Sequence, residues 1–144
     1  MKYSESNFIL NNWSELDGLR NDECIKAFEI NCKIENSFKA IKASEKKLAT
    51  ERDEIIKKVS ALDQVEKIER PDGQVFFENI PDKTKAKITA IDEELRELAD
   101  KEKKVDFEAL TKEDLDKHDM LNGKILRLFG PIIDLSKKEE PKKD

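Results

Sequence analysis

The sequence predicts a mainly α-helical protein, an antiparallel coiled-coil helical hairpin with a short β-hairpin at its tip and a small helical base. Apolar residues recur at alternating steps of three and four along two stretches, 22–65 and 81–104. Charged residues make up 42% of the 144 residues and aromatic residues only 6%, which is typical of long solvated helices. A turn-forming run, Pro71-Asp72-Gly73, separates the two stretches, so the chain is expected to fold back on itself.

The longer stretch, 22–65, carries the clearest pattern. Its apolar seam consists of Ala27, Ile34, Phe38, Ile41, Leu48, Ile55, Val59 and Leu62. The spacing follows the 3.5-residue repeat of a coiled coil, with a longer step wherever a polar residue occupies the seam. These polar positions are Asn31, Glu45 and Arg52, and such positions usually lower stability and fix the register. Glu45 and Arg52 are therefore candidate partner-binding residues, which would pair across the hairpin or recruit a further helix.

Residues 66–78 are expected to form the β-hairpin. The run Pro71-Asp72-Gly73 supplies a fixed φ, a side-chain bond to the backbone and a residue that tolerates positive φ. Phe76 and Phe77 follow on the second strand, where successive side chains point to opposite faces. One of them is expected to cover the helix ends, because an isolated two-stranded hairpin is only marginally stable. The other is a candidate partner contact, with simple packing as the alternative.

The second helix is expected to span 81–104, with Pro81 in its first turn. It repeats the three-four spacing through a seam of Ile88, Ile91, Leu95, Leu98 and Val105, interrupted by polar Glu102. Since this stretch is shorter than 22–65, it can cover only the C-terminal half of the long helix.

The remaining segments must cover the other half of the long helix as a helical base. Residues 1–21 are expected to form a leader helix, capped by Ser6 or Asn7, and 105–135 are expected to form the C-terminal part of the base. Thr111 is a predicted helix cap with an acid three residues later. The side chains expected to pack together include Phe8, Trp13 and Leu16 around Cys24, Phe28, Ile34 and Phe38. Residues 1–135 are interpreted as a single domain, and 136–144 as a disordered tail.

The sequence does not indicate a catalytic, cofactor or metal site. His118 is expected to be exposed on a polar turn, with no nucleophile placed to use it. Cys24 and Cys32 lie in one predicted helix about 12 Å apart, beyond the reach of a disulfide, and match no zinc pattern. The acidic run Asp92-Glu93-Glu94 is better explained as a solvated helix face than as a magnesium site.

The charge pattern bears on partners and location. The formal net charge is −5, and acids and bases are interspersed, so no basic face for nucleic acid is expected. No stretch approaches the roughly 20 apolar residues of a transmembrane helix. No signal peptide is recognisable at the start of the sequence. We therefore expect a cytoplasmic protein without nucleic-acid or membrane partners.

The order of these features is similar to that of small proteins of unknown function encoded by tailed bacteriophages. The matching stretches are 31–62, the run Arg70-Pro71-Asp72-Gly73-Gln74-Val75-Phe76, and Glu93-Glu94-Leu95-Arg96-Glu97-Leu98. This resemblance covers most of the chain and implies a phage origin, with a location in the host cytoplasm or the virion. It implies a role in virion assembly or host takeover, and it assigns no functional residues.

The function expected from these features is non-enzymatic. The protein would act as a structural or protein-interaction element that presents a coiled-coil surface, as a phage virion or assembly accessory protein. Its partner would be a protein, either a second copy or another phage structural protein. The alternative is a small inhibitor or adaptor that masks a host enzyme, with the acidic balance engaging a basic surface.

Overall fold

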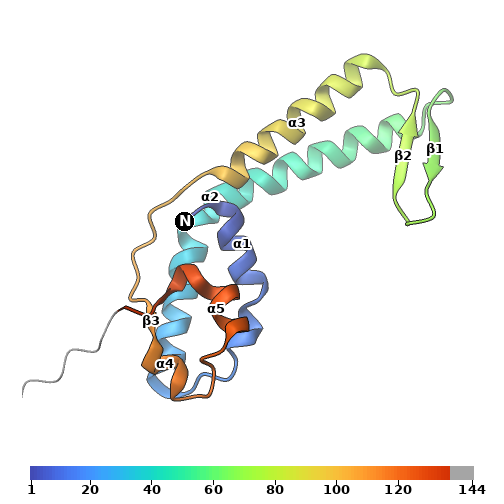
Figure 1. Cartoon of the computed structure of the whole chain (residues 1–144). Coiled ribbons are helices and arrows are strands. Elements are labelled where there is room, and N and C mark those ends of the chain that lie inside the picture. The colour runs from blue at the N-terminus through green and yellow to red at the C-terminus, as the bar shows by residue number, and fades with distance from the viewer. Residues whose placement is uncertain (137–144) are drawn as a thin grey trace, which may run out of the picture. The chain divides into compact units, whose positions relative to one another are not determined.

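The computed structural model describes residues 1–136 of the chain (Figure 1). The protein is mainly helical, as the sequence predicts, and it contains a small antiparallel sheet of two strands. Its contacts divide the chain into two compact units. Unit 1 comprises Met1–Lys39 together with the chain from Lys101 onward, and unit 2 comprises Ala40–Asp100. The interpretation of 1–135 as one domain stays a prediction.

The long helix, α2 (Asn21–Ser60), contributes to both units. Its first turn contains Asp22 and Glu23, whose negative charges favour the positive end of the helix dipole. The helix ends at Ser60, whereas the sequence had predicted 22–65. The reason is local, because the backbone N–H groups of Leu62 and Val65 donate to carbonyls only three residues back, in tight turns.

Unit 2 contains the predicted strands 66–78 as β1 (Glu66–Glu69) and β2 (Val75–Glu78), which pair antiparallel. The connecting turn has the expected chemistry. Gly73 N donates to Arg70 O at 3.0 Å, and Gln74 N donates to the Asp72 carboxylate at 3.0 Å. Gly73 has a φ of 85°, so the loop is a tight turn followed by a residue in the left-handed region.

The second helix, α3 (Asp82–Asp100), is shorter than the predicted 81–104. Beyond Asp100 the chain leaves the helix, because its backbone pairs with the first residues of the protein. Tyr3 N donates to Lys101 O at 2.9 Å, and an isolated antiparallel bridge joins Lys2 to Glu102. Glu102 is therefore not a seam position of a helix, and this segment belongs to unit 1.

The leader also differs from the predicted single helix over 1–21. It contains α1 (Tyr3–Asn11) followed by a short 3₁₀ helix, η1 (Trp13–Leu16). The expected caps, Ser6 and Asn7, lie inside α1 because the helix already starts at Tyr3. The hydroxyl of Ser6 is buried and donates to Tyr3 O at 2.7 Å.

The C-terminal part of unit 1 alternates short strands and helices. It consists of β3 (Leu110–Thr111), α4 (Lys112–Asp116), α5 (Gly123–Phe129), the 3₁₀ helix η2 (Gly130–Ile132) and β4 (Ile133–Asp134), with β3 and β4 paired in parallel. The predicted cap at Thr111 is confirmed, because Asp114 N donates to Thr111 Oγ1 at 3.2 Å. Ser136 follows in a turn, and the rest of the predicted tail lies outside the described residues.

Four side chains expected in the core of unit 1 are not buried, and one of them, Trp13, is half-buried. The buried apolar residues of unit 1 are Tyr3, Ile9, Leu16, Leu19, Ala27, Ile30, Ile34, Phe38, Leu110, Leu115, Met120, Ile125, Phe129 and Ile132. Phe8 and Phe28 were expected among them but are 52% and 67% exposed, and Cys24 is exposed as well. Because α2 buries the side that carries Ala27, Ile30 and Ile34, the neighbouring Phe28 side is left in solvent.

Candidate functional site

The β-hairpin carries the two phenylalanines that the sequence singled out. Phe76 pairs with Ile68 across the strands and is 40% exposed, with the Arg70 guanidinium 4.1 Å from its ring centroid. Phe77 pairs with Lys67 and is half-buried. The two rings point to opposite faces of the sheet, because successive side chains alternate along a strand.

Apolar surface is present on both faces of this small sheet. Ile68 and Phe76 share one face and are 37% and 40% exposed. Val75 shares the other face with Phe77 and is 42% exposed. The helices of unit 2 expose mostly charged side chains. The exposed large apolar side chains of unit 2 lie on the hairpin, apart from Leu62, which is 40% exposed. Exposed apolar clusters of this kind commonly mark binding surfaces.

The polar seam residue Arg52 has a partner in the same chain. Its Nε lies 2.8 Å from Oδ1 of Asp92 on α3, and both side chains are more than one-third exposed. Asp92 belongs to the acidic run that was considered for magnesium, and here it binds a guanidinium. Glu45, one heptad before Arg52, is half-buried on α2. The partner-binding roles of these two residues and of the two phenylalanines stay predictions.

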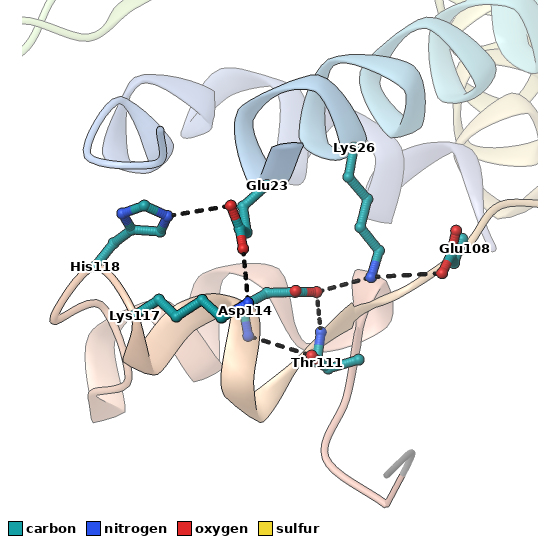
Figure 2. Close-up of polar contacts among 7 residues, drawn as sticks. All are labelled: Glu23, Lys26, Glu108, Thr111, Asp114, Lys117 and His118. Carbon is teal, nitrogen blue, oxygen red and sulfur yellow. Dashed lines mark hydrogen bonds and ion pairs between the residues drawn. The ribbon is translucent and has the colours of Figure 1, made fainter. Parts of the chain in front are cut away.

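Unit 1 contains a polar cluster that joins α2 to α4 (Figure 2). Lys26 Nζ lies 2.7 Å from Oδ2 of Asp114, and the two side chains are only 18% and 7% exposed. The same Asp114 oxygen accepts a hydrogen bond from Thr111 N at 2.9 Å. Glu108 lies at the edge of the cluster, 3.9 Å from Lys26 Nζ and largely exposed.

The environment of Asp114 lowers the pKa of its carboxyl group. Burial acts in the opposite direction and raises the pKa, because it disfavours the charged form. The hydrogen bonds from Lys26 and from the Thr111 backbone outweigh burial, so the pKa is lowered from its ordinary value. Asp114 is thus held as a carboxylate that caps one helix and binds another.

His118 is not exposed, contrary to the sequence expectation. Its side chain is 13% exposed, and Nε2 lies 3.5 Å from a carboxylate oxygen of Glu23 on α2 (Figure 2). The turn after α4 brings it there, since Asp119 adopts a positive φ of 55° and Met120 N donates to Leu115 O. The buried Nε2 has no hydrogen-bond partner.

Glu23 also forms an ion pair with Lys117, because Lys117 Nζ lies 3.1 Å from the other carboxylate oxygen of Glu23. The pKa of Glu23 is lowered chiefly by a hydrogen bond from its own backbone N–H at the helix start and by the hydrogen bond from Lys117, and the nearby His118 acts in the same direction. Sequence reasoning missed this contact, although two signals were available. Glu23 is an acid in the first turn of α2, and the bases Lys117 and His118 follow a helix capped by Thr111. The cluster pairs acids with bases, so it holds α4 against α2.

A shallow hollow lies on the surface of unit 1 beside the start of α2. Its volume is about 380 Å³. It is lined by Trp13, Leu16, Asp17, Leu19, Arg20, Cys24, Ala27 and Phe28. Most of this lining is apolar, and Phe28 stands exposed at its edge.

No three His, Cys, Asp or Glu side chains in residues 1–136 gather closely enough to hold a metal ion. Within the same range, every helix is too short or too polar to cross a bilayer. Comparison with family models, curated proteins and solved structures found no match to this chain.

Proposed function

We propose that the protein acts by binding another protein and that unit 2 supplies the binding surface. In this proposal α3 folds back along the second half of α2 as an antiparallel coiled coil, and the β-hairpin forms the exposed end of that rod. The proposal assigns the contact to Phe76 and Phe77, with Glu45 and Arg52 setting the register of the helices.

The folded-back arrangement is supported by an ion pair and by the burial pattern. The contact between Arg52 and Asp92 joins α2 to α3. In unit 2 the buried apolar residues are Ile41, Val59, Ile91 and Leu98, and all of them occupy predicted seam positions. Leu48, Ile55, Ile88 and Leu95, which continue the two seams, are half-buried. Alternating burial at steps of three and four is the pattern of helices that pack through a seam.

The observation that carries the proposed function is the exposed apolar surface of the hairpin. A two-stranded sheet cannot bury both of its faces, and Ile68, Val75 and Phe76 are each more than one-third exposed. Both strands also have an unpaired edge, which offers backbone N–H and C=O groups to a further strand. A protein partner would cover the apolar side chains and the open edges together.

The biological setting proposed here comes from the resemblance to phage-encoded proteins. On that basis the protein is a virion or assembly accessory protein, and the partner is another phage structural protein. The net charge of −5 suits a protein that must stay soluble until it assembles.

The test is affinity capture with the purified full chain in extracts of infected host cells. The variants Phe76→Ser and Phe77→Ser are compared with the matched control Phe8→Ser, whose ring is exposed on α1. We expect the wild type and the Phe8 variant to capture the same capsid or tail protein and the hairpin variants to lose it. Retention of that protein by both hairpin variants would place the contact elsewhere. Capture of a host nuclease or polymerase instead would favour the inhibitor.

A further inference from the structure

The first half of α2 exposes a second apolar surface, which we call the Phe28 face. It consists of Cys24, Ile25, Phe28 and Cys32. Phe28 and Ile25 are 67% and 59% exposed, Cys24 is exposed and Cys32 is half-buried. At about 100° per residue, Phe28 lies roughly a quarter-turn around the helix from the buried Ala27. The Phe28 face is therefore separate from the buried side of α2 in unit 1.

We propose that a second copy of this chain covers the Phe28 face, with the two α2 helices antiparallel and Phe28 close to the two-fold axis. In such an isologous contact, residues equally distant from the axis on opposite sides lie level with each other. Cys24 precedes Phe28 by four residues, and Cys32 follows it by four. Cys24 of one copy then lies level with Cys32 of the other.

The charges that flank the Phe28 face match this arrangement. Arg20 immediately precedes α2 and lines the hollow with Cys24 and Phe28, and Glu35 follows Phe28 by seven residues on α2. An antiparallel pair therefore brings Arg20 of one copy toward Glu35 of the other. Both of these flanking charges are exposed. A parallel pair would place Arg20 beside Arg20 and Glu35 beside Glu35. Like charges at these positions oppose that alternative.

The hollow beside α2 provides room for the partner. Cys24 and Phe28 form part of its lining, so a helix laid over the Phe28 face would also cover the hollow. Asp17 and Arg20 also line the hollow, so both signs of charge are present there. An unrelated helix would meet the apolar surface, but it would have no matching order of charges.

The size of the surface sets the expected strength of association. Only Ile25 and Phe28 expose large apolar side chains on the Phe28 face of each copy. Stable protein interfaces usually bury about 1,600 Å² in total, much more than these side chains supply. We therefore expect a reversible dimer whose proportion rises with protein concentration and falls with added salt.

Disulfide cross-linking tests the register directly. The full chain is treated with diamide, which takes two electrons and two protons from a pair of thiols and leaves a disulfide. Two single variants, Cys24→Ser and Cys32→Ser, are oxidised separately and as an equimolar mixture. We expect a covalent dimer in the mixture, because one chain supplies Cys24 and the other supplies Cys32. Each variant alone should cross-link at least tenfold less.

The register is overturned if either single variant cross-links alone as well as the mixture does. It is also overturned if the mixture forms no covalent dimer. Cross-linking within one chain does not compete, because eight residues of helix separate the two sulfurs by about 12 Å. Peptide mapping of the oxidised wild type should identify the Cys24–Cys32 linkage between chains.

Sedimentation measures the association without cysteine chemistry. Phe28→Ser is compared with Phe8→Ser, which removes a similarly exposed ring on α1. We expect the Phe28 variant to stay monomeric at concentrations where the wild type and the Phe8 variant dimerise, with unchanged helical circular dichroism in all three. A second pair tests the charges, because Arg20→Glu should weaken the dimer and the addition of Glu35→Arg should restore it. A wild type that is monomeric up to millimolar concentration overturns the proposal.

Discussion

Lys26 Nζ and Asp114 Oδ2 lie 2.7 Å apart although 88 residues separate them in the sequence. Lys26 stands on the first half of α2, and Asp114 caps α4 through Thr111. One carboxylate therefore completes a local helix start and also holds that helix against a distant element. A buried carboxylate with both kinds of donor is expected to matter more for stability than an exposed ion pair.

Replacing Asp114 by Asn should lower the free energy of unfolding by about 2 kcal/mol, because hydrogen bonds to a charged group contribute about 1.5–3 kcal/mol each. The amide would keep the shape of the side chain but lose the charge that binds Lys26. Urea denaturation measures this change. The control is Glu108→Gln, since this exposed carboxylate lies 3.9 Å from Lys26 and should contribute little. Equal effects of the two substitutions would contradict the role assigned to Asp114.

The lowered pKa of Asp114 predicts a loss of stability in acid. A carboxyl group with a folded-state pKa below its unfolded value stabilises the protein above the unfolded value, and this contribution is lost as the pH falls through the folded value. The ordinary pKa of Asp114 is 3.8, so the loss should begin near that pH and continue below it. Unfolding of the wild type and of Asp114→Asn should be compared from about pH 6 to pH 2. The variant should show a shallower decline, and parallel curves would refute the assignment.

Gly73→Ala should weaken the β-hairpin. Gly73 has a φ of 85°, which costs a residue with a Cβ about 1–2 kcal/mol, although open space surrounds the position. Hydrogen exchange at the Arg70 amide, which donates to Gln74 O across the turn, reports the effect locally. The matched control is Gly123→Ala at the start of α5, where the space is also open and φ is not positive. Unchanged exchange at Arg70 in the Gly73 variant would show that the turn tolerates an alanine.

A double-mutant cycle on Arg52 and Asp92 should give a coupling energy of about 0.2–1 kcal/mol, the range for partly exposed ion pairs. The single variants Arg52→Ala and Asp92→Ala and their combination are compared by denaturation at low and high salt. Coupling should weaken as salt rises, because the pair is more than one-third exposed. The control cycle uses Lys67 and Glu69, a more exposed pair within one strand. Absence of coupling at low salt would remove this support for the proposed coiled coil.

Much of the secondary structure could be predicted because it depends on short-range rules. The turn at Gly73 and the cap at Thr111 follow from residues within four positions of each other. The start of α2 likewise follows from adjacent acidic residues, Asp22 and Glu23. These features need no knowledge of the rest of the fold.

Several of the errors arose where distant segments compete with local preference. The seam of α3 continues in sequence toward Val105, but backbone pairing with Lys2 and Tyr3 ends the helix at Asp100. His118 has polar neighbours in sequence, yet Glu23 lies beside it in the structure. Phe28 was expected in the core because its side chain is large and apolar. Only the packed structure shows which side of α2 the base covers.

The contacts of Tyr3 have a further consequence for how the chain can vary. The centroid of its ring lies 5.8 Å from that of Phe38, next to the point where the chain leaves unit 1. Its backbone N–H donates a hydrogen bond to the carbonyl of Lys101, where the chain returns to unit 1. The chain thus leaves unit 1 and returns to it beside the same residue, Tyr3. Insertions are best tolerated where their ends lie close together. A change in the length of unit 2 would leave the contacts of Tyr3 intact, so unit 2 can vary in length while unit 1 stays the same.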